Sequence, residues 1–441
     1  MRGRPRAEAL EVAVSIAGVL QRTPFARWHP KVPASVRKEW WLLLNTGVPS
    51  QILLLAYLAR AGIMFEACGQ AAELFDRAAR DLSGTHLEPW LLKGFTGLAW
   101  INQHLSDLGF WPSGGNEEID ARLLRLLGRR WKGHFDLLYG LVGIGIYGLE
   151  GLPRPGAREI VARVVDHLDR QAERSRGLVT WLTPPDEIAF TPEGSYSLGM
   201  AHGVPAVIGF LARAYEGGIA RRRVAALLNG AVAWLLGQRL PTQSRSAFAP
   251  WTYPGQAPSS SRAAWCYGDP GVAAALFRAG QALDRPQWTR VALSLMRRTA
   301  ERSQVSSGVR DATLCHGAVG LAHQLNRFWQ ATDDQYFAAA ARKWYRRALD
   351  YRRRGKGVAG FERFGMLHAT AEPTGGSRRA RWSADPGLLT GAAGIGLALL
   401  AAATPIEPKW DRLLLLDLRP VSRLGGGSDL SAPIKEGESP K

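Results

Sequence analysis

The sequence predicts an all-α fold, an α/α toroid of six or seven helical hairpins. Three observations support this prediction. A glycine motif recurs six times, each motif precedes an apolar run rich in Ala and Leu, and amphipathic segments of mixed charge separate these runs. No alternating run of useful length indicates a β-strand. Recurrence every 45 to 75 residues or so is typical of stacked hairpins, so the repeating unit is a helical hairpin.

The glycine motifs mark where the inner helices are expected to begin. They are Gly94-Phe-Thr-Gly97, Gly140-Leu-Val-Gly143, Gly203-Val-Pro, Gly268-Asp-Pro-Gly271, Gly317-Ala-Val-Gly320 and Gly391-Ala-Ala-Gly394. Apolar runs over 144–149, 206–214, 272–279 and 395–403 follow four of them and are predicted inner helices. Glycine pairs let neighbouring backbones approach closely and are expected to leave the amides at each helix start free. If the hairpins close into a ring, these helix starts converge.

Amphipathic segments supply the predicted outer helices, each with one solvated face. The clearest cover residues 157–173, 222–236, 287–301 and 334–351. A first hairpin is expected within residues 8–66, without a clear glycine motif. The first twenty residues imitate a secretory signal, but Glu8 and Glu11 interrupt the apolar middle, so they are interpreted as a helix.

The chain is expected to form one toroid domain over residues 1–423, followed by a flexible tail over 424–441 that has almost no apolar content. The longest loops are expected at 183–197, 240–261 and 355–386, where Pro, Gly and Ser gather, and loops of this length usually carry function or are disordered. The most apolar stretch, 40–65, is interrupted by polar residues too often to span a membrane.

The net charge and the cysteine content of the chain limit its possible binding partners and its cellular compartment. The formal charge of +18 comes mostly from arginine clusters, which favour an acidic partner. None of the zinc-finger, helix-turn-helix or stacking signatures lies beside these clusters, so nucleic acid is not the predicted partner. Three cysteines cannot form a disulfide framework, and the metal chemistry below requires reduced thiols. A cytoplasmic location is therefore predicted.

Three consecutive motifs also carry metal-binding side chains: Ala201-His202-Gly203, Trp265-Cys266-Tyr267-Gly268 and Leu314-Cys315-His316-Gly317. Equivalent positions in neighbouring hairpins place these side chains at one mouth of the ring. Two thiolates and one imidazole predict one zinc ion per chain, held by Cys266, Cys315 and His316 with the fourth coordination position open. Three roles are open for His202: a fourth ligand, a structural histidine or an acid–base group.

The strings WCYGDPG, LCHGAVG, SLGMAHGVPAVIGFLARA and FDLLYGLVGIGIYGL resemble the lanthionine synthetase C-like proteins, the cyclases of class I lanthipeptide biosynthesis. The resemblance extends from the motif at Gly94 to Leu415. It implies an α/α toroid with zinc held by the cysteine of WCYG and by the cysteine and histidine of CHG. It also places four further residues at the active site, namely His202, Asp136, Arg262 and Tyr267. The known bacterial cyclases carry a small inserted domain, for which no gap between motifs here is long enough.

This resemblance implies a Michael-type addition of Cys thiols to dehydroalanine or dehydrobutyrine in the same peptide. The implied partners are a dehydrated precursor peptide, with its leader and core, and a lanthipeptide dehydratase. A general acid must then protonate the α-carbon, and His202 is the candidate. Asp136 can fix the tautomer of His202, and Arg262 can stabilise the enolate oxygen or orient Asp136.

Plainer roles stay open for the supporting residues. Asp136 fits a helix N-cap, Arg262 a surface charge and Tyr267 core packing. His134 and His323 are expected to be structural or solvated. Cys68 is expected to be a small buried apolar side chain.

Two other functions fit the same sequence. One is an enzyme that adds glutathione or another small thiol to dehydrated residues. The other is a zinc-stabilised scaffold, without catalysis, for a dehydratase and a precursor peptide. An α/α-toroid glycosidase fits poorly, because the motifs offer no convincing pair of carboxylates.

Overall fold

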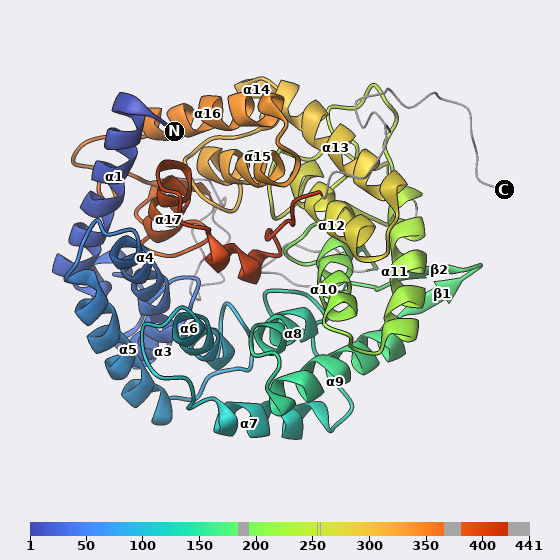
Figure 1. The fold of residues 1–441 in the computed structure, drawn as a ribbon, viewed down its shortest axis with the longest axis horizontal. Helices are drawn as coiled ribbons and strands as arrows, with labels where there is room; N and C mark the ends of the chain where they lie inside the picture. The colour runs from blue at the N-terminus through green and yellow to red at the C-terminus, as the bar shows by residue number, and fades with distance from the viewer. Residues whose placement is uncertain (184–193, 254, 256, 366–380, 422–441) are drawn as a thin grey trace.

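A computed structural model describes residues 1–183, 194–253, 255, 257–365 and 381–421. Within them, seven inner helices surround a common centre, which confirms the predicted toroid and sets the number of hairpins at seven (Figure 1). The inner helices are α4 (Val48–Arg60), α6 (Phe95–Asp107), α8 (Leu141–Glu150), α10 (Val204–Glu216), α12 (Asp269–Ala282), α15 (Ala318–Thr332) and α17 (Ala392–Ala403). They are almost wholly buried, and in α8 every residue is. Their apolar sequences therefore form the core.

An outer helix covers each sector of the ring. The outer helices are α1 (Gly3–Arg22), α5 (Ala67–Ser83), α7 (Glu117–Leu127), α9 (Pro155–Gln171), α11 (Arg221–Leu236), α13 (Pro286–Glu301) and α16 (Gln335–Asp350). Helix α1 packs against α17, so the first helix of the chain closes the ring against the last inner helix (Figure 1).

This closure corrects the expectation of a first hairpin within residues 8–66. That segment holds α1, whose partner is α17, and α4, whose partner is α5. Helix α4 does begin at a glycine, Gly47. The string Gly47-Val48-Pro49 repeats Gly203-Val204-Pro205 and was the available signal.

Shorter elements connect the hairpins. They are α2 (Phe25–Trp28), η1 (Ala34–Val36), α3 (Arg37–Leu42), α14 (Gln304–Ser307) and η2 (Lys409–Leu414). Three antiparallel ribbons join β1 (Glu173–Ser175) to β2 (Leu178–Thr180), β3 (Tyr196–Ser197) to β4 (Trp251–Thr252), and β5 (Arg363–Gly365) to β6 (Arg381–Ser383). Strands of two or three residues are too short to show alternation in a sequence.

The predicted tail, 424–441, lies outside the described residues, as do parts of the loops predicted at 183–197 and 355–386. The assignment of residues 1–423 to one domain stays a prediction. No helix in the described part of the chain is long and apolar enough to cross a membrane.

A loop folds back over the start of each inner helix, and this explains the motif glycines. A Cβ on Gly140 would lie 2.2 Å from the carbonyl oxygen of His134, and a Cβ on Gly317 would lie 2.1 Å from the backbone nitrogen of Thr313. The first three amides of α8 donate to the carbonyls of residues 134–136, at 3.0 to 3.3 Å. The expectation that these amides are free is wrong here, because the loop carbonyls satisfy them.

Backbone hydrogen bonds also join the motif loops of neighbouring hairpins. Ala201 N donates to Cys266 O at 3.3 Å, Trp265 N to Cys315 O at 3.0 Å, and Cys315 N to Leu389 O at 2.7 Å. The loops that carry the predicted metal ligands are therefore fixed to one another by backbone contacts, independently of any metal.

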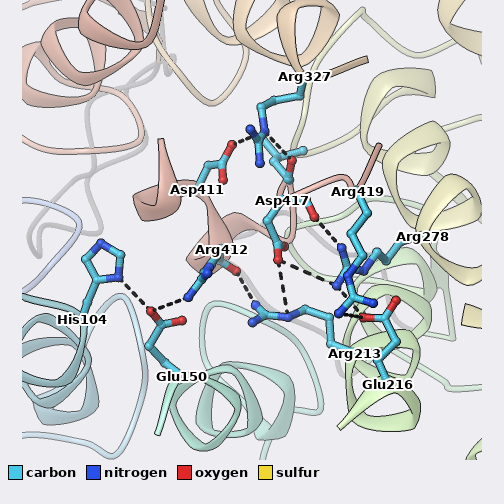
Figure 2. A network of polar contacts seen from close by, with 11 residues as sticks. His104, Glu150, Arg213, Glu216, Arg278, Arg327, Asp411, Arg412, Asp417 and Arg419 are labelled. Atoms are coloured by element: carbon cyan, nitrogen blue, oxygen red, sulfur yellow. Dashed lines mark hydrogen bonds and ion pairs between the residues drawn. The ribbon is translucent and has the colours of Figure 1, made fainter. Parts of the chain in front are cut away.

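The segment after α17 that includes η2, called the C-terminal segment below, lies over the centre of the ring (Figure 1), and its Arg412 reaches Glu150 at the C-terminal end of α8 (Figure 2). The buried Asp411 accepts hydrogen bonds from His323 Nε2 at 2.9 Å and forms an ion pair with Arg327 Nε at 3.0 Å. Trp265, next to the predicted ligand Cys266, donates from Nε1 to Leu414 O at 3.0 Å. This segment therefore closes the end opposite the motif loops and contacts the loop before α12.

Candidate metal centre

The structure brings Cys266, Cys315 and His316 together. The loop before α12 carries Cys266 and the loop before α15 carries the other two, and their ligand atoms all lie within 4.8 Å of one another. Both cysteines are buried and His316 is half-buried. Two sulfurs and one imidazole nitrogen at this separation suit a tetrahedral metal with one position left for a further ligand.

The environment of His316 supports a fit to zinc. Its Nε2 faces Asp311 Oδ2 at 3.9 Å, whereas its Nδ1 is buried and has no hydrogen-bond partner among the described residues. A buried nitrogen without a partner is unfavourable unless something binds it. Nδ1 is therefore the atom of His316 that suits coordination, and soft sulfur donors beside it favour zinc over magnesium or calcium.

The two thiols differ in acidity. The hydrogen bond from Cys315 lowers the pKa of Cys266 well below its ordinary value, against the effect of burial, and the Arg262 guanidinium adds to the lowering. The same hydrogen bond, followed by burial, raises the pKa of Cys315. Arg262 Nη2 lies 3.9 Å from Cys266 Sγ. A bound metal would take the place of the protons on both thiols.

A buried acid–base pair lies beside the three ligands. His202 Nδ1 is 2.6 Å from Asp136 Oδ2, and Asp136 Oδ1 accepts the backbone amide of Tyr139 at 2.6 Å. The His202 ring stacks between Tyr139 and Tyr267, with centroids 5.4 and 5.9 Å away. With Nδ1 held by the carboxylate, Nε2 is the nitrogen left to face a substrate.

The alternative role of Asp136 as a helix N-cap does not match this geometry. The residue at the start of α8 is Gly140, whose side chain cannot cap, and Asp136 lies four residues earlier. Its carboxylate orders the turn before the helix through Tyr139 and reaches His202 with the other oxygen.

Tyr267 and Arg262 flank Cys266 on either side. Tyr267 is half-buried and its hydroxyl has no partner in the described part of the chain. Burial raises the pKa of Tyr267, and the negative charge of Cys266 adds to this. Arg262 is solvent-exposed, with its guanidinium next to the Cys266 sulfur. Tyr267 therefore contacts His202 and follows the ligand Cys266 directly in the sequence. The guanidinium of Arg262 lies next to the Cys266 sulfur.

Asp311 is a site residue that the sequence analysis missed. Its carboxylate accepts the amide and hydroxyl of Thr313 at 3.0 and 2.8 Å and the amide of Phe364 at 2.9 Å, and it faces His316. A signal was present, because Asp311 lies six residues before Gly317 and Asp385 lies six before Gly391. An Asp six residues before the motif glycine therefore accepts a backbone amide in the turn before α15 and in the turn before α17.

The remaining cysteine and histidines considered above are Cys68, His323 and His134. Cys68 is exposed on α5, so the expectation of a small buried side chain is wrong. His323 is fully buried and stacks on Trp410, as expected of a structural histidine. His134 packs against Tyr139, with ring centroids 6.0 Å apart.

A seven-hairpin α/α toroid with two cysteines and a histidine gathered at one mouth places the chain in the class of α/α-toroid proteins, with a candidate metal site at that mouth. The sequence model of the lanthionine synthetase C-like protein family matches residues 42–415. The chain therefore belongs to the lanthionine synthetase C-like family.

Solved structures with similar folds include nisin cyclase. It is 20% identical, the match covers 90% of this chain and 96% of that chain, and the TM-score is 0.69. At this identity the likeness shows a shared fold. An unsaturated glucuronyl hydrolase from Streptococcus agalactiae (11% identity, 93% and 94% covered, TM-score 0.48) and a D-mannose isomerase (13%, 63% and 73%, 0.42) are too distant to support any argument. No curated protein sequence matches the chain.

Proposed function

We propose that this chain is a zinc-dependent lanthipeptide cyclase. It adds Cys thiols of a dehydrated precursor peptide to dehydroalanine or dehydrobutyrine in the same peptide, forming lanthionine and methyllanthionine rings. The observation that carries the proposal is the position of the three metal ligands beside the buried pair of His202 and Asp136, with Tyr267 between them. Membership of the lanthionine synthetase C-like family supports it.

In this proposal Cys266, Cys315 and His316 would hold one zinc ion, with a fourth position left for the substrate thiol. Zinc supplies one thing: it lowers the pKa of that thiol so that the sulfur is a nucleophile at neutral pH. The Arg262 guanidinium, 3.9 Å from the Cys266 sulfur, would offset the negative charge of a further thiolate at this site.

The addition forms a bond from sulfur to the β-carbon and breaks the double bond between the α- and β-carbons. The electron pair moves towards the adjacent carbonyl, and a proton must then reach the α-carbon. His202 donates this proton from Nε2, because Asp136 holds Nδ1 and stabilises the imidazolium form. The proton released by the thiol restores His202, so the peptide keeps its mass.

Tyr139 and Tyr267 both stack on the His202 ring, with ring centroids 5.4 and 5.9 Å away. This packing limits rotation about the side-chain bonds and keeps Nε2 in a constant direction. We infer that both tyrosines position the acid, and that a dehydratase supplies the dehydrated precursor.

The assay counts free thiols in a dehydrated precursor by alkylation and mass spectrometry, before and after incubation with the protein. We expect free thiols to disappear with no change in peptide mass. His202→Asn should slow this loss by about 10²- to 10⁴-fold while the zinc content stays the same. Thiols that stay alkylatable with every dehydrated precursor tested would refute cyclisation.

The same assay separates the two alternatives. If free glutathione adds to the peptide and raises its mass, the small-thiol reaction is favoured. If the protein is a scaffold, ring formation in a mixture with the dehydratase does not depend on His202.

A further inference from the structure

A groove lined by cations lies beside the loop that leads to Asp136. It is formed by the loop after α7 and the C-terminal end of α9, and it encloses about 710 Å³. Its lining consists of Gly128, Arg129, Arg130, Trp131, Lys132, His167, Arg170 and Gln171. We call it the basic groove. No carboxylate lines it.

The floor of the basic groove is held in place by polar contacts. Trp131 Nε1 donates to His134 O at 2.9 Å, His167 Nε2 lies 2.8 Å from Leu127 O, and Gln171 Nε2 donates to Trp131 O at 3.4 Å. The loop after α7 is therefore fixed to α9 by its aromatic and amide groups. Its cations take no part in these contacts.

Four cations line the basic groove: Arg129, Arg130, Lys132 and Arg170. All four are exposed, and within the described residues none forms an ion pair with a carboxylate. Other surface arginines of this chain do pair, as Arg163 does with Glu159 at 2.6 Å on the same helix α9. Four unpaired cations around one hollow produce a concentrated positive potential that favours a polyanionic partner.

The basic groove lies close to the proposed active site. Arg130 is six residues before Asp136, so the two lie within about 20 Å even for an extended chain. The loop also carries His134, which packs against Tyr139, and Tyr139 stacks on His202. A peptide seated in the groove therefore needs only a few further residues to reach the pair of Asp136 and His202.

We propose that the basic groove docks an acidic segment of the peptide substrate. This rests on the proposed function only in taking a peptide as the substrate. The guanidinium groups of the arginines and the ammonium group of Lys132 can pair with Asp and Glu side chains of the peptide. The Trp131 ring offers an apolar surface against which the aliphatic parts of those side chains can pack. The groove thus holds one part of the peptide while another part reaches the metal centre.

The binding test uses a rhodamine-labelled oligoglutamate peptide and its oligoglutamine counterpart, followed by fluorescence anisotropy at low and moderate salt. The groove variant is Arg129→Glu, Arg130→Glu and Lys132→Glu together. Its matched control is Arg342→Glu, Lys343→Glu and Arg346→Glu on α16, which lies on the other side of the ring (Figure 1). Both variants change the net charge of the protein equally. A difference in their affinity for oligoglutamate therefore reports the position of the substituted charges rather than the net charge.

We expect the groove variant to bind oligoglutamate about tenfold or more weakly than the unmodified protein, and the control to bind it nearly as well. Added salt should weaken binding to the unmodified protein. Equal losses in both variants, or no loss in either, would overturn the proposal. So would tighter groove-dependent binding of a single-stranded oligonucleotide than of oligoglutamate.

A second experiment measures KM and kcat for cyclisation and distinguishes this proposal from the cyclase proposal. With a precursor that carries an acidic segment, the groove variant should raise KM and leave kcat unchanged, and with a precursor whose acidic residues are replaced by glutamine it should change neither. If no variant cyclises any precursor, the cyclase proposal fails while the binding result still decides whether the groove takes acidic peptides.

Discussion

Two buried carboxylates each face one histidine of the site. Asp136 holds Nδ1 of His202 at 2.6 Å, and Asp311 faces Nε2 of His316 at 3.9 Å. The nitrogen that each carboxylate leaves free is the one that can react or bind. His202 therefore presents Nε2 to a substrate, and His316 presents Nδ1 to a metal.

Removing the carboxylate of Asp311 should weaken zinc binding. Asp311→Ala frees the His316 ring to rotate, and we expect zinc affinity to fall by about 10- to 100-fold in competition with a chelator. Asp385→Ala is the matched control, because Asp385 holds the same turn position before α17, where its amide partner Gly387 is no metal ligand. Equal loss of zinc in both variants would show that Asp311 acts on the fold alone.

At this scale the sequence predicted the three ligands because two consecutive glycine motifs carry them, one with Cys266 and the next with Cys315 and His316. It left the roles of Asp136 and Tyr267 open, since their partners come from other hairpins and contacts between distant residues leave no local pattern. The role of Arg262, to stabilise an enolate oxygen or to orient Asp136, stays a prediction, and its guanidinium lies 3.9 Å from the Cys266 sulfur. Asp311 was missed because its effect on His316 depends on a turn held by Phe364, from another part of the chain.

The start of each inner helix is the element on which the site depends. The preceding loop returns so close to the motif glycine that a Cβ there would meet its backbone, and at α8, α15 and α17 the loop carbonyls also accept the first helix amides. The recurrence of glycine was therefore visible in the sequence, whereas the loop that requires it was not. The amides that we expected to be free at these helix starts are bonded in α8, α15 and α17.

Adding a methyl group at one of these glycines should destabilise the protein. A Cβ at position 140 meets backbone at 2.2 Å, so we expect Gly140→Ala to lower the free energy of unfolding by roughly 1 to 3 kcal/mol in urea denaturation. Gly69 on α5 has open space around it, and Gly69→Ala should raise stability by about 0.5 to 1 kcal/mol. The same sign for both variants would contradict this account.

The C-terminal segment forms the other critical element. Glu150, at the end of α8, accepts His104 Nδ1 at 2.8 Å and lies 3.4 Å from Arg412 Nη1 (Figure 2). Burial alone would raise the pKa of Glu150, but His104, Arg213 and Arg412 outweigh it and hold that pKa below its ordinary value.

This lowered pKa gives a pH prediction. A carboxyl with a depressed folded pKa stabilises the protein above its unfolded value of about 4.3, and that stability is lost as pH falls through the folded value. The free energy of unfolding should therefore fall less between about pH 5 and pH 3 in Glu150→Gln than in the unmodified protein. Glu159→Gln, in an exposed pair with Arg163, should follow the unmodified protein. Identical pH profiles for all three proteins would contradict the role of Glu150.

At the scale of the whole molecule, periodicity predicted the toroid because each hairpin repeats the same apolar and amphipathic segments. The way in which the ring closes was not predictable from the repeat. The partner of α17 is α1, at the opposite end of the sequence, and only the packed structure joins them. Closure matters for the site, because the ring keeps the motif loops at one end and the C-terminal segment at the other.

The most direct test of the central claim is zinc K-edge X-ray absorption on the purified, zinc-loaded protein, with and without a dehydrated precursor that contains cysteine. We expect two sulfur ligands at about 2.3 Å and one imidazole nitrogen, with a light atom completing the site, and a third sulfur when the precursor is added. Four protein ligands that do not change with the precursor, or a Cys315→Ala variant that keeps the same spectrum, would contradict an open site held by Cys266, Cys315 and His316.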